Sequence, residues 1–503
     1  MGTNTSYRQL EDRFRRLTAL GDAEAILHWD LATMMPRGSS DARAEQLAAL
    51  RAVRHGLLMA SEVEDWLGEA TVSDGLDDWQ KANLREMQRA HAHAVALDET
   101  QVDALSRATS ACEAIWREAR AAADFGRVLP SLRTLLGLVR EVAAAKGERL
   151  GLSPYDALLD EYEPDGRAVE IDALFAELGT FLPAFLATVL ERQAKQPAPI
   201  KPTGPFPIES QRQIAVQLMQ ALGFDFDHGR LDVSLHPFCG GTPDDVRITT
   251  RYDETDFRSA LMGVMHETGH ALYQRNLPLA WRGQPVGDAR GMVLHESQSL
   301  LIEMQVCRSR QFLDYATPLL RTALAGDRAP PGDRAWQADN LYRHYTRVAP
   351  GLIRVEADEV TYPLHVILRY DLERAMLAGN LDPADLPDAW SEGLGRLLGL
   401  RPPDDRRGCL QDIHWYDGAW GYFPTYTLGA MAAAQIFAAA CAADGAIEPG
   451  IARGDFAPLA TWLARSVHGL GCRYSSRDLL VHATGSPLAT NAFTNHLRRR
   501  YLP

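Results

Sequence analysis

Apolar residues recur every three to four positions along most of this chain, which is the spacing that places them on one face of an α-helix. The pattern is clearest in the N-terminal half, and it returns from Pro318 to the C-terminus. The N-terminal stretches are 5–22, 78–125, 172–195 and 209–222. The sequence therefore predicts a mainly α-helical protein.

One region departs from this pattern and contains two short runs that are rich in β-branched and apolar residues. The runs, 231–235 and 246–252, flank the loop 239–243. We interpret them as an antiparallel pair joined by a long loop, so the predicted fold has one small antiparallel β-sheet. Such a strand can bind an extended peptide by adding it as a further strand, but an ordinary structural sheet explains the pattern equally well.

The composition changes at 196–207, where five prolines fall within twelve residues. Proline fixes the dihedral φ and lacks an N–H, so this segment should form a stiff, extended connection. Short apolar residues between the prolines favour a packed boundary over a free linker. We therefore predict a single unit, 1–503, in two subdomains, 1–195 and 196–503.

The formal charge of −14 and the lack of a long basic run argue against nonspecific nucleic-acid binding. The six cysteines are scattered and form no C-x-x-C pair, as in a cytosolic protein with reduced thiols. The N-terminal residues 1–8 are polar, unlike a secretory signal. No run is apolar enough to predict a membrane span, and the nearest, 428–443, resembles a buried alanine-rich helix. We expect a cytoplasmic protein without nucleic-acid or membrane partners.

The candidate chemistry lies in an H-E-x-x-H pattern, His266 to His270, inside a predicted helix at 255–275. Histidines four residues apart project from the same helix face and can bind one zinc ion through neutral nitrogens. Glu267 lies about 100° further round the helix. Its carboxylate can therefore reach a water molecule at the metal and act as a base without being a ligand.

As an alternative, the two histidines and Glu267 could lie on a solvent-exposed face of the helix without binding a metal. The residues around them argue against that alternative because most are apolar. They include Leu261, Val264, Met265, Ala271 and Leu272. A buried helix does not carry two histidines and a glutamate without partners, since burying unsatisfied polar groups is costly.

A hydrolytic zinc site keeps three protein ligands and one open position. The third ligand is expected on another element, and Glu296 in the predicted return helix 291–303 is the candidate. Glu303, two turns further along that helix, is the rival. His295 points in another direction and is expected to support the site or to belong to the core.

Six motifs resemble those of the carboxypeptidase Taq family of zinc metallopeptidases and occur in that family's order along the chain. One is the H-E-x-x-H pentapeptide. The others are His236-Pro237-Phe238, Asp245-Val246-Arg247-Ile248-Thr249, His295-Glu296-Ser297-Gln298, Ile353-Arg354-Val355-Glu356-Ala357-Asp358 and Gly408-Cys409-Leu410-Gln411-Asp412-Ile413-His414-Trp415. The N-terminal His28-Trp29-Asp30 is also similar, so the resemblance spans nearly the whole chain, and no motif position departs from it.

The resemblance implies a multi-helix, deep-groove fold like that of angiotensin-converting enzyme and neurolysin. Residues 1–195 would form one helical wall and part of a lid, and 196–503 would form the zinc-binding catalytic part. The implied cofactor is Zn²⁺, with Co²⁺ as an alternative because nitrogen and oxygen ligands admit both. The implied partners are peptide substrates and a second copy of the chain in a homodimer.

The resemblance also brings together candidates that lie far from the metal motif in the sequence. His414, Tyr422 and Tyr426 would stabilise the oxyanion formed during peptide hydrolysis, although either tyrosine could instead belong to the core. His236, from the first motif, is a candidate substrate-binding residue.

An enzyme that acts on peptide ends also needs a cation for the terminal carboxylate, and a guanidinium fits a carboxylate through two parallel hydrogen bonds. Arg354 is the first candidate and Arg247 the second. As alternatives, Arg354 could pair with Glu356 or Asp358, and Arg247 with a neighbouring aspartate.

The leading hypothesis is a metal-dependent carboxypeptidase of broad specificity that uses water activated at zinc. An oligopeptidase that cuts inside short peptides is the enzyme alternative. A peptide-binding scaffold with a decayed site is the other alternative, and the intact metal and base residues argue against it.

Overall fold

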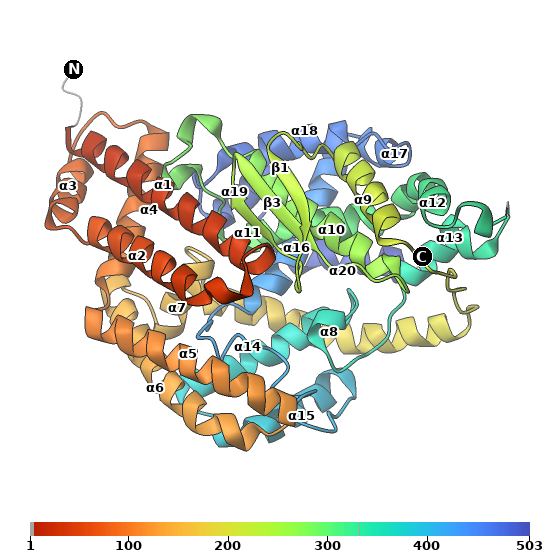
Figure 1. The fold of residues 1–503 in the computed structure, drawn as a ribbon, viewed down its shortest axis with the longest axis horizontal. Coiled ribbons are helices and arrows are strands. Elements are labelled where there is room, and N and C mark those ends of the chain that lie inside the picture. Colours follow the sequence, from red (N-terminus) through yellow and green to blue (C-terminus); the bar gives the residue numbers. More distant parts are fainter. Residues whose placement is uncertain (1–4, 331, 503) are drawn as a thin grey trace.

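The computed structural model describes residues 5–330 and 332–502. The first part of the polar N-terminus, 1–4, lies outside the described residues. Helices pack around one another in most of the molecule, and one small sheet lies near its centre (Figure 1). The prediction of a mainly α fold with one small sheet is confirmed within the described part of the chain.

Polar side chains define where several N-terminal helices begin. Asp77 accepts a hydrogen bond from the backbone N–H of Gln80, and Asp98 does the same with Gln101. Each glutamine bonds back, which satisfies two N–H groups at each helix start. The helices of this part are α1 (Thr5–Thr33), α2 (Ser40–Leu58), α3 (Ser61–Thr71), α4 (Asp78–Val95), α5 (Glu99–Ala122), α6 (Phe125–Leu150), α7 (Pro154–Tyr162) and α8 (Ala168–Ala194).

The part after residue 196 contains the helices that build the site. They are α9 (Ile208–Leu222), α10 (Phe257–Arg275), α11 (Gly291–Leu300), α12 (Arg310–Leu324), α13 (Ala338–Tyr345), α14 (Tyr362–Ala378), α15 (Leu386–Leu398), α16 (Pro424–Ala443), α17 (Ile447–Ile451), α18 (Ala457–Ser466), α19 (Ser476–Thr484) and α20 (Thr490–Tyr501). α11 continues directly into a π-helix, Leu301–Cys307. Such wide turns are rare and often occur at functional sites.

The sheet differs from its prediction in strand direction. Its strands are β1 (Gly229–Val233), β2 (Cys239–Thr242) and β3 (Asp245–Thr250), in the order β1-β3-β2. β2 and β3 are antiparallel, but β1 and β3 are parallel, so the predicted antiparallel pairing of 231–235 with 246–252 is wrong. The reason is that the predicted loop supplies a strand of its own. The chain reverses after Thr242, and β3 then enters between β1 and β2.

Close approaches between helices surround the motif of two histidines. α10 packs against β3 on one side and against α11 on another, and α11 packs against α16. A Cβ atom on Gly269 of α10 would lie only 2.4 Å from the carbonyl oxygen of Gln298, and one on Gly429 of α16 would lie 2.8 Å from Cβ of Glu296. Both positions therefore require glycine.

The hydrophobic core crosses the predicted boundary at residue 195. The main cluster extends from Cys112 in α5 to Leu497 in α20, and a smaller one joins α1, α3 and α4. α1 also lies against β2, and Trp29 of α1 stacks on Arg230 and Arg247, whose guanidinium carbons are 4.9 and 4.5 Å from the ring centre. The division into two subdomains stays a prediction.

Two helices, α8 and α16, are long and apolar enough to cross a membrane by length and composition alone. The sequence analysis expected no segment long and apolar enough to span a membrane, and that expectation is wrong. It fails at α8 because most charged residues of this helix lie toward its two ends, which leaves a long apolar stretch between them. Core helices of globular proteins meet the same criteria, and α16 packs against α11, α19 and α20. This finding alone is weak evidence of membrane contact.

Replacing Gly269 by alanine is expected to push α10 away from α11, because the added methyl group would overlap the Gln298 carbonyl. Overpacking of this kind costs about 1–3 kcal/mol, so thermal unfolding followed by circular dichroism should occur at a lower temperature. Gly263→Ala is the matched control on the same helix, where the nearest atom is Pro237 Cγ at 4.0 Å. Equal destabilisation of the two variants would show that this helix contact is not tight.

Candidate metal centre and catalytic site

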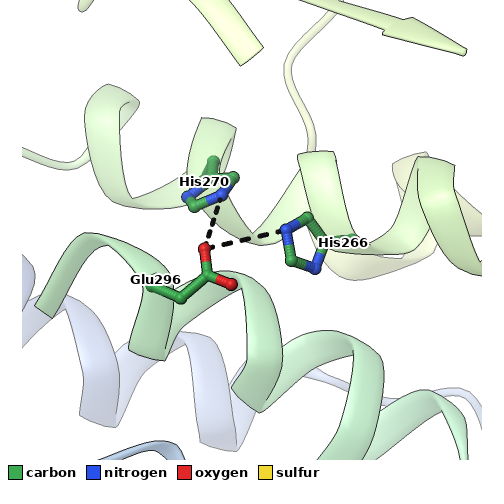
Figure 2. A group of neighbouring side chains, drawn as sticks. All are labelled: His266, His270 and Glu296. Atoms are coloured by element: carbon green, nitrogen blue, oxygen red, sulfur yellow. Dashed lines mark ion pairs between the residues drawn. The ribbon is translucent and has the colours of Figure 1, made fainter. Parts of the chain in front are cut away.

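Three side chains from two helices converge on one point. His266 and His270 project from the same face of α10, and Glu296 reaches toward them from α11 (Figure 2). Glu296 Oε2 lies 3.5 Å from Nε2 of His270 and 3.8 Å from Nε2 of His266, and all three atoms lie within 4.8 Å of one another. Atoms that are each about 2.0–2.2 Å from a tetrahedral zinc ion lie about 3.3–3.6 Å apart. The spacing therefore fits a metal ion.

The charges around this point also suit a dication. Burial would raise the pKa of Glu296, but His266 and His270 outweigh it and lower that pKa to about 2. Burial alone would lower the pKa of His266, yet the carboxylates of Glu296, Glu303 and Glu267 raise it to about 10. Positive charge is therefore strongly favoured here, and nitrogen plus carboxylate ligands are a donor set that zinc accepts.

Glu303, the rival third ligand, supports the site from the outside. Its Oε2 lies 2.9 Å from Nδ1 of His266, while Nε2 of the same ring faces Glu296. Arg308 donates to the other oxygen of Glu303. A carboxylate in this position fixes the tautomer and orientation of a metal-binding histidine. Glu303 stands in the π-helix that follows α11.

His295 packs against the second histidine. Its ring centre is 4.5 Å from that of His270, and its Nε2 accepts a hydrogen bond from Gln274 Nε2 at 2.9 Å. Burial lowers the pKa of His295 to about 3, so the ring is neutral. Nδ1 of His270 is buried, and none of the described residues bonds to it.

Glu267 lies next to the metal point and is almost fully buried. Burial raises the pKa of its carboxyl, and the charges of His266 and His270 oppose that rise. A carboxylate with a raised pKa is a stronger base toward water at neutral pH. Burial and the charge of Glu267 also raise the pKa of the Cys239 thiol. β2 packs against α10, the helix that carries Glu267.

The structure brings the three predicted oxyanion candidates together. Nε2 of His414 lies 3.2 Å from the hydroxyl oxygen of Tyr426, and the ring centres of Tyr422 and Tyr426 are 5.1 Å apart. Burial raises the pKa of both tyrosines, and the charge of Glu296 adds to the rise, so both lie close to the third metal-ligand candidate. Burial, together with nearby Arg354, lowers the pKa of His414 to about 4 and keeps its ring neutral.

Arg354 is buried beside these tyrosines and pairs with a distant aspartate. Its Nε and Nη2 donate to Asp412 Oδ1 at 3.0 and 2.8 Å, and its Nη1 donates to the hydroxyl of Tyr362 at 2.9 Å. Its guanidinium carbon lies 4.9 Å from the ring centre of Tyr426. The considered pairing of Arg354 with Glu356 or Asp358 does not occur among these contacts.

A second arginine shares the same aspartate. Nε of Arg369 donates to Asp412 Oδ2 at 2.7 Å, and Arg369 is fully buried. Two cations and one anion leave this buried cluster, Arg354–Asp412–Arg369, with a net charge of +1. Three of the five N–H groups of Arg354 are used. Among the residues that the structure describes, the other two have no hydrogen-bond acceptor.

The remaining predicted substrate-binding residues have different surroundings. Arg247 donates to both oxygens of Asp245, at 2.9 and 2.6 Å, and stacks on Trp29, as in the structural alternative considered for it. His236 is exposed between β1 and β2, and its carbonyl accepts from Ser234. In the described part of the chain, no hydrogen bond or ion pair joins the His236 ring to the metal group.

The sequence analysis missed several residues that contact the site residues, because their partners are far away in the sequence. Arg369 and Tyr362 lie outside every quoted motif, whereas Asp412 lies inside one and was given no role. Glu373 was also missed. It accepts hydrogen bonds from Tyr155, from Trp415 Nε1 and from the backbone N–H of Gly421, and so fixes the segment that leads to Tyr422. Asp412, the acidic residue within the motif 408–415, was the one sequence feature that could have indicated a partner for Arg354.

Comparisons with known proteins agree with this arrangement. The carboxypeptidase Taq (M32) metallopeptidase family model matches residues 9–501. Thermostable carboxypeptidase 1 of Thermus thermophilus is 39% identical over 100% of this chain and 99% of its own length. Metallocarboxypeptidase 1 of Trypanosoma cruzi has a similar structure, with a TM-score of 0.97, 39% identity and 100% of both chains covered. An M32 carboxypeptidase of Deinococcus radiodurans gives 0.93, 35% identity and 99% of both chains.

The two glutamates of the metal region are expected to differ in what their removal does. Glu296→Gln should lower metal occupancy most, because it removes a ligand charge. Glu303→Gln should weaken metal binding by about 10–100-fold, because a neutral amide holds the ring of His266 less strongly than a carboxylate does. Metal affinity measured against a competing chelator would separate the two effects. If Glu303→Gln lost its metal while Glu296→Gln kept it, Glu303 would be the third ligand.

Proposed function

The chain belongs to the carboxypeptidase Taq (M32) family of metallopeptidases, and from this premise we propose that it uses zinc, held by His266, His270 and Glu296. Its activity is that of a metallocarboxypeptidase, which releases amino acids from the C-terminus of peptides. The distances of 3.5 and 3.8 Å from Glu296 Oε2 to the two histidine nitrogens support zinc, as does the nitrogen and carboxylate donor set. Cobalt is the alternative metal, since the same donor set accepts it.

The observation that carries this proposal is the convergence of Nε2 of His266, Nε2 of His270 and Oε2 of Glu296. A second, buried carboxylic acid, Glu267, lies beside them. A metal bound there supplies Lewis acidity, which makes water more acidic and polarises the scissile carbonyl. Glu267 takes a proton from the attacking water and passes it to the leaving amine.

The oxyanion that forms on the scissile carbonyl needs hydrogen-bond donors. We assign this role to the neutral ring of His414 and to the hydroxyls of Tyr422 and Tyr426. Their contacts with one another and their closeness to Glu296 support the assignment. Because the pKa of each tyrosine is raised, both hydroxyls keep their protons and can donate at neutral pH.

The terminal carboxylate of the peptide is assigned to Arg354. The cluster Arg354–Asp412–Arg369 has a net charge of +1 in a buried setting, so one further anion would balance it. Arg354 also lies against Tyr426, on the side of the site that holds the oxyanion candidates. Arg247 is less favoured, because Asp245 already occupies its guanidinium.

The peptide backbone is assigned to β2, one of the two outer strands of the sheet. β2 stands at an edge in the order β1-β3-β2 and packs against α10, the helix that carries Glu267. An extended peptide added along this edge would pass directly in front of the base and the metal ligands.

The two alternatives are less well supported. An oligopeptidase that cuts inside peptides does not need a buried positive charge beside its metal, and the family and its named relatives are carboxypeptidases. A scaffold with a decayed site would not retain the metal ligands, the base and the support of His266 by Glu303 together.

We further propose a cytoplasmic location and a homodimer. The location rests on the scattered cysteines, and among the described residues all six are free. The homodimer rests on the family resemblance alone. Light scattering of the purified protein would show twice the chain mass if the homodimer forms, and cell fractionation would test the location.

Glu267→Gln should keep the metal and lose most turnover, because removal of a general base costs on the order of a hundred-fold or more. Chelation of wild-type enzyme should abolish activity, and added zinc or cobalt should restore it. Both results are read from hydrolysis rates together with metal content. Near-normal turnover in a metal-loaded Glu267→Gln protein would mean that another group activates the water.

Arg354→Ala should cripple the release of single C-terminal residues. Leaving a carboxylate without its buried partner costs roughly 2–5 kcal/mol, which corresponds to a loss of about thirty-fold or more in kcat/KM. Amidation of the peptide should therefore slow the wild type far more than the variant. Mass spectrometry of matched free and amidated peptides measures both rates and identifies the products.

The ratio of the rates on free and amidated peptides is insensitive to partial misfolding, because a loss of folded enzyme lowers both rates by the same factor. Arg247→Ala is the matched control, since it removes an ion-paired arginine on β3, the strand that packs against α10. If Arg247→Ala changed the ratio and Arg354→Ala did not, Arg247 would hold the terminus. Release of internal fragments by the wild type would replace the carboxypeptidase assignment with the oligopeptidase one.

A further inference from the structure

A cavity of about 310 Å³ lies against the two helices that position Glu296. It is bounded by the start of α8 on one side and by α19 on another, and Val293 of α11 and Leu428 of α16 also line it. Further apolar side chains in its lining are Ile171, Leu174, Leu480 and Leu488. The volume falls in the range of small-molecule sites, roughly 300–1,000 Å³.

Charged groups of both signs line the same cavity. Glu163 is buried, and burial raises the pKa of its carboxyl to about 7. Arg167 and Arg477 also line the cavity, and Arg477 is an exposed residue that pairs with Glu170 at 2.8 Å. A ligand with an apolar body, one cationic donor and one anionic group would therefore find a partner for each of its parts.

The buried carboxylate of this cavity also fixes the start of the metal-ligand helix. Glu163 Oε2 accepts the backbone N–H of Val293 at 2.9 Å. Gly291, the first residue of α11, has a positive φ of +59°, and a Cβ there would lie 2.5 Å from the same oxygen. Val293 precedes Glu296 by less than one helical turn. An occupant that touched Glu163 and Val293 would therefore contact the first turn of the helix that carries Glu296.

We propose that this cavity is a regulatory site for a free apolar L-amino acid, the class of product that a carboxypeptidase releases, so the inference rests on the proposed function. The α-ammonium group bonds to Glu163, and the side chain lies among the apolar lining residues. The α-carboxylate lies near Arg167, because Glu170 already pairs with Arg477. Charge complementarity at both ends favours an amino acid over an apolar amine or a fatty acid.

Binding has a direct consequence for the enzyme. The ammonium group competes with the Val293 N–H for the carboxylate of Glu163, which loosens the first turn of α11. Metal-ligand geometry at Glu296 then becomes less well fixed, and kcat falls. An apolar amino acid released from peptides would in this way slow further release.

The first test measures binding to the full-length, metal-loaded enzyme by equilibrium dialysis with radiolabelled L-leucine. Leu174→Trp fills the cavity and should lose the binding that depends on it. Val169→Trp is the matched control, because Val169 is exposed on the same helix and does not line the cavity. Leu488→Trp fills the cavity from another element and replaces Leu174→Trp if that variant fails to fold by circular dichroism.

Two analogues identify which ends of the ligand are recognised. 3-Methylbutylamine has the ammonium group without the carboxylate, and 4-methylpentanoate has the carboxylate without the ammonium group. Both should bind more weakly than L-leucine in wild type and in Val169→Trp. Equal binding of either analogue would overturn the assignment of an amino acid and indicate an amine or a fatty acid instead.

Kinetics separate this cavity from product binding at the catalytic site. L-Leucine at the catalytic site raises KM alone, whereas occupancy of the cavity lowers kcat. The wild type and Val169→Trp should show the loss in kcat, and Leu174→Trp should keep only the rise in KM. Purely competitive inhibition of the wild type, or equal L-leucine binding by Leu174→Trp and Val169→Trp, would overturn the proposal. The dialysis measurement needs no turnover, so its failure leaves the peptidase assignment untouched.

Discussion

The main constraint on this structure is that several acidic side chains lie next to two histidines inside the protein. Unbalanced buried charge there raises the free energy of the folded state. Glu267, Glu296 and Glu303 contribute three negative charges around the metal point, and Arg308 offsets one of them. With neutral histidine rings, the formal sum is −2. A divalent cation would balance that sum and allow these groups to remain buried together on tightly packed helices.

The contacts between α10 and α11 determine where the charged side chains of the metal region lie. Gly269 lets the helices approach until side chains from both can reach a common point. The π-helix after α11 carries Glu303, which holds the outer nitrogen of His266. Glu163 holds the first turn of α11 at its other end. The third ligand candidate, Glu296, is therefore fixed on both sides along its own helix.

Much of the site follows from local patterns in the sequence. Helical spacing is enough to place His266 and His270 on one face, and a return helix is enough to supply Glu296. The sequence could not show that Arg354 pairs with Asp412, because the partners are 58 positions apart and nearer acidic residues were equally plausible. The sequence also could not predict the direction of the strands. Two apolar runs have the same pattern in parallel and antiparallel pairs, and only the third strand, β2, decides between them.

The position of β2 has a further consequence for solubility. An unpaired sheet edge is a template on which other chains can add strands, and aggregation can start there. β2, one of the two outer strands, is only four residues long, Cys239–Thr242, and α1 lies against it. A short edge with a helix beside it leaves little backbone for a second protein molecule to extend. The molecule thereby presents a strand edge beside its candidate metal ligands while limiting self-association through that same edge.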